Sequence, residues 1–269
     1  MSVRIEKSAS VWTIVNSRPE ARNAVNPETA AALRNAFLDF DRDGSASVAV
    51  LWGEGGAFCS GWDLKPAAEL DASGALGDLD PHNSTGEPGD GSEIPSGPMG
   101  PTRLELTKPV IAAVAGPAVA GGMELALWCD FRVMEEDAYM GVYCRRWGIP
   151  LIDGGTVRLP GIVGEGRARE IILTGRTVTA TEAERIGLCE YVVEPGGARA
   201  KAEELAHAIA SFPQECVRSD LRSTKRQRGL TLRQALIQEW EFSFPVLATE
   251  GIIGAGRFRD GAGRHGAGT

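Results

Sequence analysis

The sequence predicts an α/β body that is followed by a helical C-terminal region. Two apolar strands, over residues 47–52 and 108–116, each lead into a glycine-rich turn, and a helix follows the second turn. Apolar strands without alternation are typical of sheets that are buried on both faces. After Pro195-Gly196-Gly197 the pattern becomes wholly helical. We therefore expect residues 1–195 to form the α/β body and residues 196–269 to form the helical region.

The other elements have local signals of their own. β-branched and apolar runs predict further short strands over residues 3–5, 11–15, 131–134, 139–142 and 188–193. Asn26 is placed to cap a helix whose first residue is Pro27, and Thr179-Ala180-Thr181-Glu182 is a capping box. Helical spacing predicts further helices over residues 120–130, 167–173, 198–211 and 217–226, and another that begins near Thr231. The glycine-rich tail, residues 261–269, is expected to be flexible.

One long segment lacks such signals. Residues 66–107 are rich in Gly, Pro, Asp and Ser, and they include STGEPGDGSEIPSGPMGP. We expect a long mobile loop, and loops of this length inside a compact domain are often functional lids.

The charge balance limits the partners. Lys and Arg number 28 and Asp and Glu 36, which gives a formal net charge of −8. This charge argues against general binding to nucleic acid or to an anionic membrane. The N-terminus has no signal peptide and no run of apolar residues could span a membrane, so we expect a cytoplasmic protein.

Cysteine and histidine usage excludes other chemistries. The five cysteines are an odd number, and none has the spacing of a zinc site, so we expect reduced thiols and no metal. Only three histidines are present. A catalytic Ser/His/Asp or Cys/His system is therefore poorly supplied.

Two glycine-rich segments carry the candidate chemistry. In the second, Gly121 and Gly122 begin a helix, where backbone N–H groups have no partner within the helix and the helix dipole favours an anion. In the first, FCSGWDLK, a sharp turn at Gly61 would aim the Trp62 N–H at the same point. Two such donors form an oxyanion hole. Alternatively, Gly121 and Gly122 only allow a helix to pack close to a strand.

These segments resemble a known family. FCSGWDLK, KPVIAAVAGPAVAGGMELALWCD, GGTVRLP and LTGRTVTATEAERIGLCEYVV are similar, in this order, to stretches of the crotonase (enoyl-CoA hydratase/isomerase) superfamily. The resemblance implies a spiral core of ββα units and a C-terminal helical region that builds trimers or dimers of trimers. It also implies an acyl-CoA thioester as substrate, with its carbonyl oxygen between the N–H groups of Trp62 and Gly121. Coenzyme A would be part of that substrate, and no separate cofactor is expected.

The resemblance also implies proton-transfer residues. Hydratases of the superfamily use two glutamates, and Glu124 matches the first of them. Its alternative role is that of an acidic residue favoured by the start of a helix. At the place of the second glutamate this sequence has Cys144, which is a poor general acid or base. Asp153, next to Gly154-Gly155-Thr156, resembles the aspartate that works in dienoyl-CoA isomerases, although it also suits a turn.

Substrate contacts are implied for the WDLK segment and for one arginine. Trp62, Asp63, Leu64 and Lys65 match the stretch with which the family contacts its substrate, and Arg22 is a further candidate for the CoA moiety. Either cation could equally be a solvated surface residue.

Three functions follow from these residues. The first is an acyl-CoA thioester lyase of the enoyl-CoA hydratase type, acting through an oxyanion-stabilised enolate with Glu124 as acid and base. The alternatives are an enoyl-CoA double-bond isomerase, to which the missing second glutamate gives weight, and a non-catalytic acyl-CoA-binding protein. A dinucleotide-binding turn after residue 52 is rejected, because Gly53-Glu54-Gly55-Gly56 lacks the GxGxxG spacing. The acyl chain is not assigned.

Overall fold

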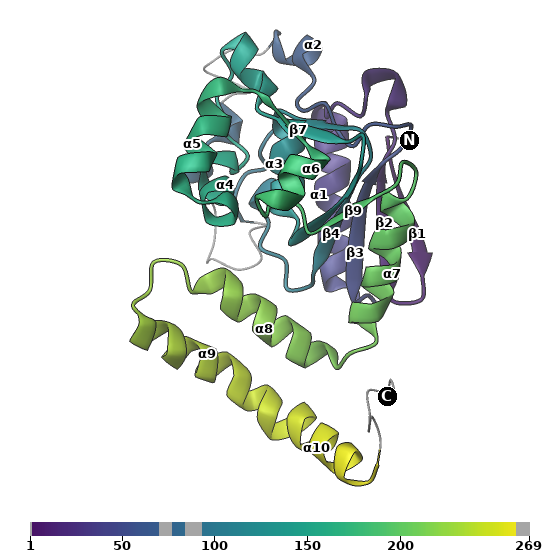
Figure 1. Cartoon of the computed structure of the whole chain (residues 1–269), viewed down its shortest axis with the longest axis vertical. Coiled ribbons are helices and arrows are strands. Elements are labelled where there is room, and N and C mark those ends of the chain that lie inside the picture. The colour runs from purple at the N-terminus through teal and green to yellow at the C-terminus, as the bar shows by residue number, and fades with distance from the viewer. Residues whose placement is uncertain (1, 70–76, 84–92, 262–269) are drawn as a thin grey trace. The chain divides into compact units, whose positions relative to one another are not determined.

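The computed structural model describes residues 2–69, 77–83 and 93–261 (Figure 1). The chain contacts divide it into two compact units, Met1–His207 and Ala208–Thr269. Parts of the expected loop, and the tail from residue 262 onward, lie outside the described residues.

The first unit is built on a six-stranded sheet. Its strands, in spatial order, are β1 (Val3–Ser8), β2 (Val11–Asn16), β3 (Val48–Gly53), β4 (Val110–Val114), β6 (Phe131–Glu135) and β9 (Tyr191–Val193). β1 is antiparallel to β2, and all other neighbours in this sheet are parallel. Parallel sheets need cover on both faces, which explains the continuous apolar residues of β3 and β4.

Helices cover the two faces of this sheet. Successive side chains of a strand point to opposite faces. In β2 the Trp12 ring lies 5.9 Å from that of Phe40 in α1 (Pro27–Arg42), whereas the Thr13 hydroxyl donates to Glu203 Oε1 of α7 (Ala198–Ala210) over 2.7 Å. The two helices therefore lie on opposite faces (Figure 1). Asn26 caps α1 as predicted, accepting from Thr29 N at 2.9 Å.

A three-stranded sheet and a group of helices complete the first unit. The sheet contains β5 (Pro117–Val119), β7 (Tyr139–Gly141) and β8 (Thr177–Thr179), with β7 in the middle. The other α-helices are α2 (Leu64–Ala67), α3 (Gly121–Trp128), α4 (Gly155–Val163), α5 (Glu165–Thr174) and α6 (Ala180–Arg185). Short 3-10 turns occur at η1 (Pro19–Ala21), η2 (Gly77–Leu79), η3 (Pro81–Asn83), η4 (Pro101–Arg103) and η5 (Tyr143–Trp147).

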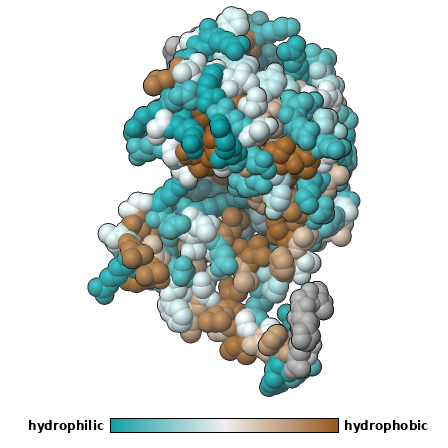
Figure 2. All heavy atoms as spheres, viewed as in Figure 1, coloured by the Kyte–Doolittle hydropathy of each residue, from teal (hydrophilic) through white to brown (hydrophobic). Residues whose placement is uncertain are grey.

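The second unit is helical. It contains α8 (Gln214–Arg226), α9 (Leu232–Val246), the π-helical turn η6 (Leu247–Gly251) and α10 (Ile252–Arg259). α8 packs against α9, but no residue of α8, α9 or α10 is buried. Figure 2 shows hydrophobic side chains exposed on these helices. They include Leu232, Leu236, Ile237, Trp240, Phe244, Ile252, Ile253 and Phe258.

The predicted fold class, an α/β body with a helical C-terminal region, is confirmed. The contact boundary falls after His207, later than the expected residue 195, and the alanines at 198, 202 and 206 of α7 are buried. The segment expected to be mobile is buried at its end, where Met99 and Thr102 are at most 1 % exposed. Helix α4 was not predicted from the sequence. In the described part of the chain no helix is long and apolar enough to cross a membrane.

Candidate active site

Two chain segments bring the predicted amide donors together. A parallel β-bridge joins Cys59, after β3, to Ala118 in β5, with Cys59 N donating to Pro117 O at 3.1 Å. Two residues beyond Cys59 the backbone turns at Gly61, whose φ is +98°. A Cβ atom on Gly61 would lie 3.0 Å from Gly121 N, so the two segments are in close contact here. Only glycine fits this turn without strain.

The N–H groups of Trp62 and Gly121 are both available to a ligand. Within residues 2–69, 77–83 and 93–261, neither group donates a hydrogen bond to the protein, and both residues line one cavity. Gly121 is the first residue of α3, where an N–H has no partner in the helix. The residue before it, Ala120, has φ 55°, an unusual value for a residue with a Cβ atom. The amides therefore have the availability that an oxyanion hole requires.

Glu124 lies one turn into α3 and lines the same cavity. Its side chain is held by backbone amides: Oε1 accepts from Asp153 N at 3.0 Å and from Gly155 N at 2.8 Å. The residue is 3 % exposed. Burial, together with the nearby charge of Asp153, raises the pKa of Glu124 to about 7. This carboxyl group can therefore gain and lose a proton near neutral pH.

Asp153 supplies a second carboxyl group. Its Oδ1 accepts from Met99 N at 3.2 Å and from the Thr102 hydroxyl. Burial raises the pKa of Asp153, while these two hydrogen bonds oppose the rise. Arg158 donates to Asp153 O at 2.9 Å and to Thr102 O at 2.6 Å, which ties the two segments together.

Each carboxyl group keeps one oxygen for a ligand. Oε2 of Glu124 and Oδ2 of Asp153 make no hydrogen bond to any residue that the structure describes. Both residues line the cavity, whose volume is about 330 Å³. Its wall also contains apolar and aromatic residues, among them Leu64, Val119, Tyr143, Trp147, Ile149 and Ile152. Two residues with free amides and two with a free carboxyl oxygen thus line one largely apolar cavity.

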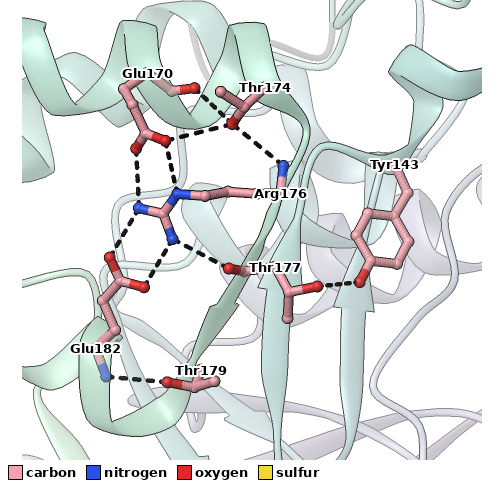
Figure 3. A network of polar contacts seen from close by, with 7 residues as sticks. All are labelled: Tyr143, Glu170, Thr174, Arg176, Thr177, Thr179 and Glu182. Atoms are coloured by element: carbon pink, nitrogen blue, oxygen red, sulfur yellow. Dashed lines mark hydrogen bonds and ion pairs between the residues drawn. The ribbon is translucent and has the colours of Figure 1, made fainter.

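Figure 3 shows how one side of this wall is fixed. The Tyr143 hydroxyl lies 2.6 Å from Thr177 Oγ1 at the start of β8. The adjacent Arg176 pairs with Glu170 of α5 and with Glu182 of α6, each at 2.7 Å. This double ion pair anchors β8 between two helices, and β8 in turn positions the Tyr143 ring.

The structure does not bring every predicted residue into the cavity. Arg22 and Lys65 are exposed and are not among the lining residues. Asp63 lines the cavity, but its carboxylate pairs with Arg18 at 3.1 Å and caps α2 through Lys65 N at 3.2 Å. Trp62 and Leu64 both line the cavity, while their contact with substrate stays a prediction.

Cys144 lies in the wall and is 8 % exposed. Burial raises the pKa of its thiol, with a further contribution from Glu124. The thiol is therefore protonated near neutral pH. Within the described residues no cluster of three His, Cys, Asp or Glu side chains could hold a metal ion.

Sequence reasoning missed the supports of Asp153. Met99 and Thr102 fall in the segment expected to be mobile, and Arg158 falls in the helix that was not predicted. One signal was present, because Met99, Leu104 and Leu106 place apolar side chains at the end of the polar loop. All three are buried.

The α/β body built on a largely parallel sheet, followed by a helical C-terminal region, is a crotonase fold. A family model described as enoyl-CoA hydratase/isomerase matches residues 6–78 and 102–246. The chain belongs to this enoyl-CoA hydratase/isomerase family and is an enzyme of the enoyl-CoA hydratase type.

Relatives and solved structures agree with this assignment. The chain is 33 % identical to enoyl-CoA hydratase EchA19 of Mycobacterium tuberculosis, over 91 % of this chain and 88 % of the relative. It is 35 % identical to the carnitinyl-CoA dehydratase of Salmonella arizonae, over 87 % and 84 %. The crystal structure of an enoyl-CoA hydratase from Bacillus anthracis is similar with a TM-score of 0.85 at 30 % identity, covering 97 % of this chain and 96 % of that one.

Proposed function

We propose that this enzyme adds water reversibly across the double bond of a 2-enoyl-CoA thioester, with Trp62, Gly121, Glu124 and Asp153 as its catalytic residues. One observation carries the proposal: two unpartnered amides and two carboxyl groups, each with a free oxygen, line the same cavity in the part of the chain that the structure describes. The name of the Salmonella relative, carnitinyl-CoA dehydratase, states a dehydration, which is the reverse direction of this reaction.

The amides act on the thioester carbonyl. When the water oxygen bonds to Cβ, the π electrons of the double bond move toward Cα and the carbonyl oxygen, which becomes an enolate oxygen. Donors from Trp62 and Gly121 stabilise this charge more than they stabilise the neutral carbonyl, so they lower the barrier. One such donor typically contributes about 2.7–4 kcal/mol.

The carboxyl groups move the protons. One of them takes a proton from the attacking water, and the other gives a proton to Cα. Glu124 and Asp153 must therefore hold a single proton between them in the active state. After the reaction the group that acted as the base carries this proton, and the group that acted as the acid is ionised. Cys144 takes no part in this transfer.

This sharing predicts a bell-shaped dependence of kcat/KM on pH. Above about 7, Glu124 loses its proton and the pair holds none, so activity falls. At lower pH the pair takes up a second proton and activity falls again. A pH–rate series on crotonyl-CoA checks this prediction. Activity that rises steadily from pH 6 to pH 9 would contradict it.

A double-bond isomerase is the second candidate, because Cys144 stands where a second glutamate would hold water. Incubation with 2-enoyl- and 3-enoyl-CoA thioesters in heavy-oxygen water, followed by mass spectrometry, separates the functions. Hydration places the label in a hydroxyacyl-CoA, and isomerisation gives an unlabelled product of unchanged mass. Binding without any product would instead support an acyl-CoA-binding protein and overturn the proposal.

The CoA moiety is expected to meet residues outside the cavity. Arg22 and Lys65 are exposed cations on the segments that also carry Ala24 and Leu64, two lining residues. We place the phosphates of CoA near them because phosphate attracts Lys and Arg.

The second unit is proposed to form a homotrimer or a dimer of trimers. The faces of α9 and α10 expose large apolar residues that a monomer would leave in water. Sedimentation equilibrium should give three or six times the chain mass of 28.5 kDa. Trp240→Arg should shift the protein toward smaller species without loss of helical circular dichroism. A wild-type monomer at micromolar concentration would contradict the proposal.

A further inference from the structure

The carboxyl group of Asp153 has an unusual environment for its position. It is 3 % exposed, and an isolated carboxylate is costly to bury. Two donors meet on one of its oxygens: the Met99 amide at 3.2 Å and the Thr102 hydroxyl. Both donors come from residues 97–103, the end of the long loop, and both residues are themselves buried.

This segment is held against the Asp153 turn at several points. Arg158 donates to the carbonyl oxygens of both Asp153 and Thr102, at 2.9 and 2.6 Å. Arg103, next to Thr102, donates to Ile152 O at 3.5 Å and to Pro95 O at 2.9 Å. The approach is so close that a Cβ atom on Gly97 would overlap Asp153 Oδ1. Because residues 97–103 are fixed in this way, the Thr102 hydroxyl is held within hydrogen-bonding distance of Asp153.

We propose that Thr102 is a positioning residue: its hydroxyl, together with the Met99 amide, keeps the buried Asp153 carboxylate ionised. The free oxygen of this carboxylate, Oδ2, then accepts the proton from water. Glu124 supplies the proton to Cα. The inference rests on the proposed function, which it deepens by assigning the base and the acid. A hydroxyl that donates to a carboxylate favours its charged form.

The charges around Asp153 are consistent with this assignment. Glu124 of α3 faces it as a second carboxyl group, and the positive charges of Arg103 and Arg158 favour the Asp153 anion. The charge of Asp153 also contributes to the raised pKa of the buried Cys59 thiol. The negative charge of Asp153 also contributes to the raised pKa of Glu124.

Thr102→Val tests the inference because valine keeps the shape and removes the donor. We expect the acidic limb of the kcat/KM profile to move up by about one pH unit, with activity on that limb about tenfold lower. Thr102→Ser, which restores a hydroxyl, should recover the wild-type limb. If the valine variant does not fold, Thr102→Ala replaces it.

Thr107→Val is the matched control. Its hydroxyl donates to the carboxylate of Asp41 at 3.0 Å, in an exposed position outside the cavity. This variant should keep the wild-type profile.

A second measurement needs no substrate. The ¹³C carboxyl signal of Asp153, assigned with Asp153→Asn, should titrate at higher pH in Thr102→Val than in the wild type and in Thr102→Ser. The inference is overturned if Thr102→Val titrates like the wild type, or if Thr102→Ser shares the defect of the valine variant. Failure of the proposed function has a different signature: the wild-type enzyme then forms no hydroxyacyl-CoA, whatever residue 102 is.

Discussion

Replacing Glu124 by glutamine is expected to lower kcat on an enoyl-CoA thioester by about 10²–10⁴-fold, the usual contribution of a positioned acid or base. The glutamine oxygen can still accept from the amides of Asp153 and Gly155, so the site should keep its shape. Steady-state kinetics and the affinity for a non-reactive acyl-CoA are the measurements. Binding should change much less than kcat.

The control is Glu136→Gln, an exposed glutamate outside the cavity, which should retain full activity. If Glu124→Gln kept more than about a tenth of the wild-type kcat, the acid–base role of Glu124 would be excluded.

The same substitution should change how stability depends on pH. The folded-state pKa of Glu124, about 7, lies above its ordinary value of 4.5, so the folded protein binds more protons than the unfolded chain between these values. The free energy of unfolding contributed by this group therefore falls as pH rises from about 4.5 to 7. In Glu124→Gln this decrease should be absent. At pH 8 the free energy of unfolding of the variant should therefore exceed that of the wild type by up to about 3 kcal/mol. Denaturant unfolding at pH 5 and pH 8 measures the difference.

Gly122→Ala is expected to cause the largest loss of stability. A Cβ atom at this position would overlap the Cys59 carbonyl oxygen and lie 2.7 Å from its carbon, and neither backbone atom can rotate away. We expect a loss of about 3 kcal/mol, or roughly 6–12 °C in Tm. Relief must shift either α3, which carries Gly121 and Glu124, or the Cys59 segment, which leads to Trp62, so kcat should fall by about 10²-fold as well.

Gly166→Ala is the matched control for this glycine. Gly166 lies in α5, where an added Cβ atom would have no heavy atom within 4 Å, and its φ is not in the left-handed region. Alanine there should leave Tm unchanged or raise it slightly. Equal melting temperatures for the two variants would show that the contact between α3 and the Cys59 segment is not tight.

Several residues of the candidate site could be predicted from the sequence alone. Gly61, Gly121 and Glu124 lie in short segments that follow apolar strands, so their local setting is encoded by neighbours in the chain. The structure places Trp62, Gly121, Glu124 and Asp153 around one cavity, although their catalytic roles stay predictions.

Other features depend on contacts between distant segments. Nothing near Thr102 in the sequence indicates Asp153, which is 51 residues away. Likewise, the polar composition of residues 66–107 predicted a loop throughout, although the end of this segment is buried. The proline at position 160 lies inside α4, and a proline inside a helix argues against a helix prediction.

The sequence alone therefore determined the α/β class, the order of most strands and helices, and the residues that begin α3, because apolar periodicity, capping residues and glycine turns act over a few positions. Only the tertiary structure decided which loop supports Asp153, why Cys144 stays a thiol, and that Arg22 and Lys65 lie outside the cavity wall. Burial and hydrogen bonding arise where remote segments pack, and these interactions set the proton affinities on which the proposed chemistry depends.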